Sequence, residues 1–264
     1  MCSSNQGQRP YQPPQNEQER FLVKRVQELY QLAEQRGIAR YTAFLSDREQ
    51  DLARMALGKS TGEYRFWGGY SAAERKVLYI EPEYSYGVDP IVCVRIKVQQ
   101  PKQDSVPAHK DYLGAILGLG LQRDCIGDIV FDANDTAVVY VPVLEHVQSL
   151  LCEELTSVGR YAVHCEPFWE EIPYQEQERT IRTTTVSSLR VDCVLAAMLQ
   201  CARSQASDLI RSGHVSINHV PTSSVSAEVY QGDLFTVRGK GRFRLQQLGG
   251  KSRKDRLFIE YFQY

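Results

Sequence analysis

The sequence lacks any closely spaced cysteine pair, although it contains seven cysteines. None of them forms a Cys-x-x-Cys motif or a spacing that suits zinc, so the common cysteine-based metal folds are excluded. An odd number of scattered cysteines in apolar surroundings favours buried free thiols in a reducing compartment. His164 and Cys165 are adjacent, but they fall in an expected strand, so their side chains should point to opposite faces.

Long hydrophobic runs are also missing. The longest apolar stretch, around residues 113–121, is too short and too rich in glycine to span a bilayer. The first 20 residues are polar and show no signal-peptide pattern. We therefore expect a cytoplasmic protein without membrane contact, and we expect residues 1–16, which include three prolines, to form a disordered tail.

Loops that hold nucleotides or cofactors are scarce. Gly118-Leu119-Gly120 is a lone Gly-x-Gly that follows no Rossmann strand, and no P-loop occurs. The sequence suggests no pairing of a nucleophile with a base. These absences predict a protein with no cofactor, no metal and no catalytic activity.

The formal net charge of −1 hides a strong asymmetry. Residues 1–180 contain 19 Lys+Arg and 26 Asp+Glu, whereas residues 181–264 contain 12 and 6. Within the second part, residues 238–256 hold eight basic residues and one acid. Such a local basic footprint is what binding to nucleic-acid phosphates requires, while the acidic remainder could serve a protein partner.

Length and periodicity predict an α+β protein of two or three small domains. Residues 17–85 should be mainly helical, with one helix over 17–35 and another from Ser46 to about Leu57. Residues 86–180 should follow the order βαββαβ of a ferredoxin-like or RRM-like domain. Its expected strands are 91–98, 127–131, 136–141 and 161–165, and its expected helices are 109–119 and 143–157.

An RRM-type RNA surface needs aromatic side chains on its central strands. Residues 136–141 offer only Tyr140. A scaffold or protein-contact role for this region therefore stays open beside direct RNA recognition. The helix and loop at 109–128 could likewise present Lys110, Arg123 and Asp128 to RNA, or form a glycine-rich packing element between domains.

Residues 181–264 predict two short helices on a small hairpin sheet. Ser187 and Ser188 are N-cap residue types before an apolar stripe at helical spacing, and a second helix should run from Arg203 to Ser212 and end at Gly213. Strands are expected at 215–217 and 234–238, on either side of turns. The start of the second helix should favour phosphate, because a helix N-terminus presents free backbone N–H groups.

This C-terminal pattern resembles the S4 family of RNA-binding modules. The matching segments are Leu189-Arg190-Val191-Asp192, Ala202-Arg203-Ser204-Gln205-Ala206, residues 209–218, Gly232-Asp233 and residues 238–243. The sequence departs from the family at Ala202, where a serine is common. Losing a cap hydroxyl costs about 1 kcal/mol, so we expect a neighbour such as Ser204 to compensate.

The residues of this module have distinct expected roles. Arg190 and Arg203 should make bidentate contacts to phosphate, Gln205 and Asn218 should bond to ribose or a base edge, and Asp192 should orient Arg190. The expected RNA-binding set is Arg190, Arg203, Ser204, Gln205, Arg211, Asn218, Arg238, Lys240, Arg242, Lys251, Arg253 and Lys254. A second candidate RNA face consists of Arg65, Arg75, Lys76, Lys110 and Arg123.

Two further motifs narrow the resemblance to the YlmH-type S4-domain proteins. They are Phe66-Trp67-Gly68-Gly69-Tyr70 with Ala73-Glu74-Arg75, and residues 109–120 with Arg123 and Ile126-Gly127-Asp128-Ile129. The similarity covers roughly residues 20–264. It implies a non-enzymatic bacterial RNA-binding protein with a helical N-terminal part, an RRM-like middle and a C-terminal S4 domain.

The same resemblance implies a partner. The family is associated with the large ribosomal subunit, in particular with subunits obstructed by peptidyl-tRNA, and its genes often lie near cell-division genes. We therefore expect a monomer that binds ribosomal RNA, with tRNA as a further contact. The alternatives are an S4-containing RNA-modifying enzyme, since S4 modules also accompany pseudouridine synthases, and a protein-interaction adaptor in cell division.

Overall fold

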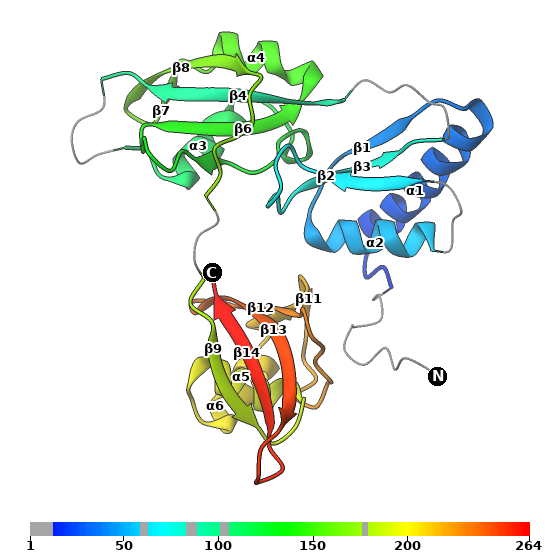
Figure 1. Cartoon of the computed structure of the whole chain (residues 1–264), viewed down its shortest axis with the longest axis vertical. Coiled ribbons are helices and arrows are strands. Elements are labelled where there is room, and N and C mark those ends of the chain that lie inside the picture. Colours follow the sequence, from blue (N-terminus) through cyan, green and yellow to red (C-terminus); the bar gives the residue numbers. More distant parts are fainter. Residues whose placement is uncertain (1–12, 59–62, 83–88, 101–105, 176–178) are drawn as a thin grey trace. The chain divides into compact units, whose positions relative to one another are not determined.

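The computed structural model describes residues 13–58, 63–82, 89–100, 106–175 and 179–264. The chain forms two compact units (Figure 1): a larger unit, Asn16–Glu176, and a smaller unit that contains Gln177–Tyr264. Residues 1–12 of the expected tail lie outside the described residues. None of the helices in the described part combines the length and the apolar composition needed to cross a membrane.

The larger unit begins with an αβαββ layer. Its elements are α1 (Glu17–Arg36), β1 (Arg40–Leu45), α2 (Asp47–Leu57), β2 (Tyr64–Trp67) and β3 (Lys76–Ile80). Both helices lie where the sequence predicts them. Ser46 and Glu49 form a reciprocal capping box at the start of α2, and α1 ends at Gly37 in the left-handed conformation. The antiparallel sheet β1-β3-β2 was not predicted.

The second half of the larger unit has the expected ferredoxin-like order. Its main elements are β4 (Ile91–Val98), α3 (His109–Gly118), β5 (Val130–Phe131), β6 (Val138–Leu144), α4 (Gln148–Glu154), β7 (Ser157–Val158) and β8 (Tyr161–Phe168), with 3₁₀ turns η1 (Arg123–Cys125) and η2 (Glu145–Val147). The sheet order is β5-β6-β4-β8-β7, with every pairing antiparallel. Several boundaries differ from the prediction: β5 and α4 are shorter, and β6 and β8 extend further along the chain.

One hydrophobic core fills the space between α3, α4 and this sheet. It contains Ile96 from β4, Val139 from β6, Ile116 from α3 and Leu151 from α4, all fully buried. A second cluster joins Phe44 and Val77 of the αβαββ layer to Leu144 of β6. Because this cluster crosses the expected boundary at residue 85, the two halves pack as one unit.

The smaller unit consists of two helices on a six-stranded sheet. Its elements are β9 (Arg182–Val186), α5 (Val191–Leu199), α6 (Arg203–Arg211), β10 (Val215–Ile217), β11 (Val220–Pro221), β12 (Leu234–Val237), β13 (Gly241–Lys251) and β14 (Leu257–Gln263). The sheet order is β11-β10-β12-β13-β14-β9. Leu195 of α5 and Ile210 of α6 pack against Phe235 and Tyr261 of the sheet.

The helix cap predicted for this unit was wrong. Helix α5 begins at Val191 with Arg190 as its N-cap, and the Ser188 hydroxyl donates to Cys193 Sγ instead of capping the helix.

The cysteine thiols of the chain are less buried than expected: Cys165 is buried, but the other five described cysteines are partly exposed. His164 is exposed while Cys165 faces the core, as the alternation predicts.

Candidate nucleic-acid interface

Arg190, Asp192 and Arg203 form one ionic cluster at the starts of α5 and α6. Arg190 donates from Nε to Asp192 Oδ1 at 3.1 Å and from Nη2 to Oδ2 at 3.0 Å. Arg203 donates from Nε and Nη2 to Oδ2 at 3.0 and 2.8 Å. The structure therefore confirms that Asp192 orients Arg190, and it adds Arg203 to the same carboxylate.

The cluster combines a buried anion with two accessible cations. The Asp192 side chain is 4% exposed, whereas Arg190 and Arg203 are 41% and 53% exposed. Burial by itself raises the pKa of Asp192, but hydrogen bonds and charge from both arginines outweigh burial and hold that pKa below its ordinary value. The carboxylate therefore stays ionised at neutral pH, and the cluster has a net positive charge that faces solvent.

The start of α6 is capped differently from the expectation. The Ala202 N–H donates to the Gln205 side-chain oxygen at 3.2 Å, which is the Gln205 half of a capping box, and Ala202 makes no side-chain cap bond of its own. The Gln205 side chain is still exposed, and its amide NH₂ faces away from this contact. Ser204 and Gln205 follow Arg203 in the first turn of the helix.

Asn218 has a structural role inside the smaller unit. Its side-chain NH₂ donates to Asp233 Oδ1 at 2.8 Å, and its Oδ1 accepts from the Leu234 N–H at 2.8 Å. Its backbone has a positive φ of 49°, which asparagine tolerates better than most residues. Both ends of its amide fasten the turn after β10 to the start of β12, and the RNA contact predicted for Asn218 stays a prediction.

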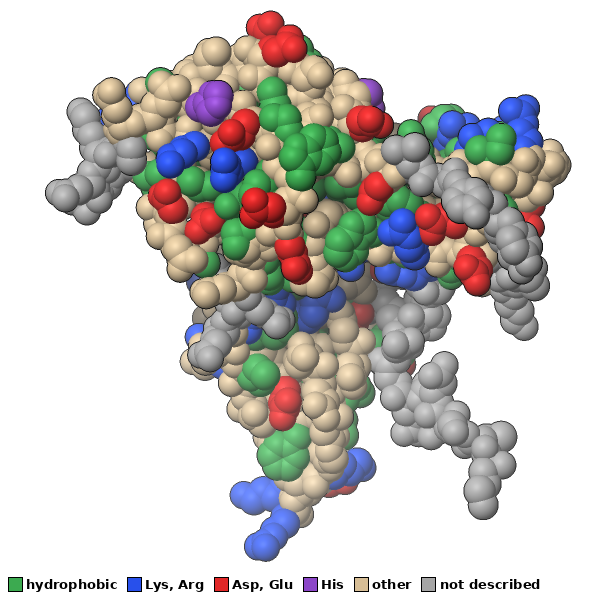
Figure 2. Space-filling model, turned by 45° about the horizontal axis from the view of Figure 1, so that its top comes forward, with side chains coloured by type: hydrophobic (Ala, Val, Ile, Leu, Met, Phe, Trp, Pro, Cys, Tyr) green, Lys and Arg blue, Asp and Glu red, His purple; other side chains and the backbone are tan. Residues whose placement is uncertain are grey.

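The remaining basic residues of the set lie in two turns of the sheet and at the end of α6. Arg238 and Lys240 are exposed in the β12–β13 turn, and Arg211 is exposed at the end of α6. Lys251, Arg253 and Lys254 are exposed around the β13–β14 turn, where Lys251 pairs with Asp255 at 2.8 Å. Figure 2 shows Lys and Arg side chains gathered at the tip of this hairpin.

An aromatic pair near the end of β14 gathers three arginines, of which the sequence analysis singled out only Arg242. Arg179 lies 4.6 Å above the Phe262 ring and 4.8 Å above the Tyr264 ring, and Arg242 lies 4.5 Å above Tyr264. Arg244 Nε donates to the Tyr264 hydroxyl at 3.0 Å. The basic count over residues 238–256 included Arg244, but only the strand register places it beside Tyr264.

The second candidate RNA face is largely a packing element. Arg75 donates to the carbonyl oxygens of Ile126 and Phe44 at 3.1 and 2.8 Å. Arg123 Nη1 donates to the carbonyl oxygens of Ile126 and Gly127 at 2.6 and 2.9 Å. Burial, and then the charge of Arg75, lower the pKa of Arg123 to about 10. The guanidinium groups of Arg75 and Arg123 therefore serve backbone carbonyls inside the larger unit, and an RNA contact by either stays a prediction.

Asp128 also faces inward. Its carboxylate accepts hydrogen bonds from the Tyr70 hydroxyl at 3.1 Å and from the Glu74 N–H at 2.7 Å. The Gly-Gly segment of the same motif packs tightly. A Cβ on Gly69, whose φ is +94°, would lie 2.9 Å from Pro142 of β6. Of the alternatives for residues 109–128, the contacts of Asp128 with Tyr70 and Glu74 favour packing between the two halves of the larger unit.

The other members of this face differ among themselves. Arg65 is exposed, pairs with Glu81 at 2.9 Å and lies 3.9 Å above the Tyr79 ring. Lys76 is half-buried, and Lys110 is exposed at the start of α3. An RNA contact by these three residues stays a prediction.

The sheet face that binds RNA in an RRM is partly covered in this chain. Tyr140 is only 5% exposed and packs in one cluster with Tyr70 and Ile172. Its ring lies 4.7 Å from that of Phe168, and its hydroxyl donates to Asp132 at 2.9 Å. Burial, and then the hydrogen bond to Asp132, raise the pKa of Tyr140 to about 12. Tyr140 therefore cannot serve as a base-stacking platform.

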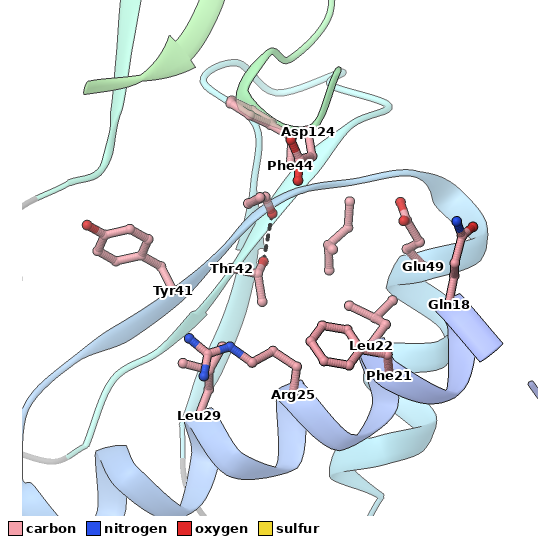
Figure 3. Close-up of a pocket in the computed structure, with 12 residues that line it drawn as sticks. Gln18, Phe21, Leu22, Arg25, Leu29, Tyr41, Thr42, Phe44, Glu49 and Asp124 are labelled. Carbon is pink, nitrogen blue, oxygen red and sulfur yellow. Dashed lines mark hydrogen bonds between the residues drawn. The ribbon is translucent and has the colours of Figure 1, made fainter. Parts of the chain in front are cut away.

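A pocket of about 350 Å³ in the larger unit lies between α1 and β1 (Figure 3). Phe21, Leu22 and Leu29 of α1 line one side, Phe44 lines the other, and Asp124 stands at the rim. The side chains that line it are mainly apolar and include no cysteine, serine or histidine.

Two short helices on an antiparallel sheet, with paired arginines at the helix starts, define an RNA-binding protein of the S4 class. The family model described as "S4 domain" matches residues 189–235, and the model described as "Putative RNA-binding domain in YlmH" matches residues 93–172.

A curated relative extends this similarity to nearly the whole chain. The "Ribosome-associated protein quality control protein P2" of Bacillus subtilis (strain 168) is 31% identical over 245 residues, which are 92% of this chain and 94% of that protein. The chain belongs to the YlmH family of S4-domain proteins. The solved structure of "Cell division protein ylmH from Streptococcus pneumoniae" aligns with a TM-score of 0.49 at 18% identity, over 61% of this chain and 96% of that one.

Proposed function

We propose that this protein is a non-catalytic, monomeric RNA-binding protein that docks through its S4 domain on structured RNA. The favoured target is ribosomal RNA of the large subunit, with tRNA as a further contact, in ribosome-associated quality control or rescue. The observation that carries the proposal is the pair of exposed guanidinium groups, Arg190 and Arg203, on the buried Asp192 carboxylate. The name of the Bacillus subtilis relative, a ribosome-associated quality control protein, supports the ribosomal target.

The chemistry of the cluster suits folded RNA better than a small ligand. Folded RNA presents phosphates and 2′-hydroxyls at fixed spacing, and proteins read its paired parts mainly by shape. Planar guanidinium groups bind phosphate oxygens in pairs of parallel hydrogen bonds. The exposed lysines and arginines of the β12–β13 and β13–β14 turns would add charge around this centre.

Sedimentation of a bacterial lysate through a sucrose gradient tests the proposal. Tagged wild-type protein should migrate with free large subunits, and Arg190→Ala/Arg203→Ala should remove it from those fractions. The matched control is Lys24→Ala/Arg36→Ala, which removes two exposed charges from α1 and should migrate like the wild type. Wild-type protein that stays at the top of the gradient would exclude the ribosomal target.

A further inference from the structure

We infer that Asp192 is a positioning residue, which joins Arg190 and Arg203 into a single fork for one RNA phosphate. The inference rests on the proposed function, because it concerns the same RNA-binding site. An acidic residue in a cationic site is unexpected if the site works by charge alone. Its geometry suggests a different purpose.

The contacts show what Asp192 does to the two arginines. Each guanidinium uses Nε and Nη2 on the carboxylate, so both planes are held by two hydrogen bonds. Nη1 of each group, together with the second hydrogen of Nη2, is left to donate elsewhere. In the described part of the chain, Asp192 is the only carboxylate within ion-pair distance of either arginine.

The carboxylate itself is out of reach of RNA. Its side chain is 4% exposed, and its backbone N–H donates to the Val225 carbonyl at 3.2 Å, which helps to fix the first turn of α5. A buried anion of this kind cannot repel phosphate at contact distance, but it can restrict the rotamers of the side chains bound to it. Ordering a free arginine on binding is costly, so arginines ordered in advance bind more tightly.

Charge and positioning predict opposite effects for Asp192→Asn. If only charge matters, removing one acid should tighten RNA binding by up to about tenfold. If Asp192 positions the fork, the neutral amide loses the charged hydrogen bonds, and binding should weaken by about tenfold because two arginines must be ordered again. The matched control is Asp208→Asn, which removes an exposed acid from α6 that lies 3.9 Å from Arg211.

The experiment measures dissociation constants with purified large ribosomal subunits as the probe. We expect Asp192→Asn to bind about tenfold more weakly than the wild type and Asp208→Asn to bind equally or slightly more tightly. Arg203→Lys keeps the charge but cannot form the planar fork, so it should weaken binding as Asp192→Asn does. This second variant changes an exposed side chain and does not disturb the core.

A purely structural role for Asp192 is separated by a double-variant comparison. In the Arg203→Lys background, which still binds measurably, Asp192→Asn should cause little further loss, because the planar fork is already gone. Equal losses in both backgrounds, or tighter binding by Asp192→Asn in the wild-type background, would overturn the inference while the proposed function stands. No subunit binding by the wild type would overturn the proposed function and the inference together.

Discussion

Asp128→Ala should destabilise the larger unit without touching the RNA-binding cluster. The carboxylate accepts from the Tyr70 hydroxyl, the Glu74 N–H and the Arg75 N–H, the last at 3.3 Å. Alanine leaves all of these donors without their acceptor in a partly buried site. It also removes a negative charge from beside Arg75, whose pKa burial already lowers.

The size of the effect follows from the lost contacts. An unsatisfied buried donor costs about 1–3 kcal/mol, and the partial exposure of this site favours the lower end of that range for each donor. The free energy of unfolding should therefore fall by about 3 kcal/mol. For a unit of this size, such a loss lowers the midpoint of thermal unfolding by about 6–12 °C.

Tryptophan fluorescence is a selective assay for this prediction. Trp67 and Trp169, the two tryptophans of the chain, both lie in the larger unit, so their emission reports the unfolding of that unit alone. Asp124→Ala is the matched control, because Asp124 is an exposed acid in the neighbouring η1 turn. Equal midpoints for the two variants would refute the assigned role of Asp128. If folded Asp128→Ala lost ribosome binding, Asp128 would instead be assigned to an RNA-binding face.

Three further predictions concern the smaller unit and the absence of catalysis. The pKa of Asp192 is held below its ordinary value, so the stability that this ionised carboxylate gives the smaller unit is present at neutral pH and should be lost as the pH falls below about 4. Hydrogen exchange of the α5 amides, measured against pH, tests this. Asp192→Asn should abolish that part of the pH dependence. Arg203→Ala should weaken RNA binding more than Lys251→Ala, and wild-type affinity should fall steeply with salt; equal losses or a flat salt profile in a binding titration would contradict docking on phosphates. Calorimetric titration with S-adenosylmethionine or ATP should show no binding, and tight stoichiometric binding of either would contradict the proposal that the protein is non-catalytic.

The elements that the sequence predicted correctly carry local signals. Ser46 and Glu49 form a capping box at the start of α2. Gly37 and Gly213, both with a positive φ, follow the ends of α1 and α6. The βαββαβ order follows from hydrophobic periods along residues 91–165. The sheet β1-β3-β2 was not predicted because its strands are only four to six residues long, and β1 pairs with β3 across the intervening α2 and β2.

The assignment of charged residues shows where local reasoning ends. Arg75 and Arg203 are both arginines in family motifs, and nothing in their neighbouring residues separates them. Arg75 donates to carbonyls brought in from η1 and β1, whereas Arg203 rests on a buried carboxylate and faces solvent. The partners of Asn218 were hidden from local reasoning in the same way, since Asp233 and Leu234 lie at the start of β12, distant in sequence.

The sequence by itself determined the α+β class, the S4 module, the YlmH resemblance and the concentration of positive charge after residue 180, because spacing, capping and composition act over short distances along the chain. Only the tertiary structure decided which polar side chains are available to RNA. That property depends on burial and on the direction of each side chain, and both are set by contacts between segments far apart in the sequence.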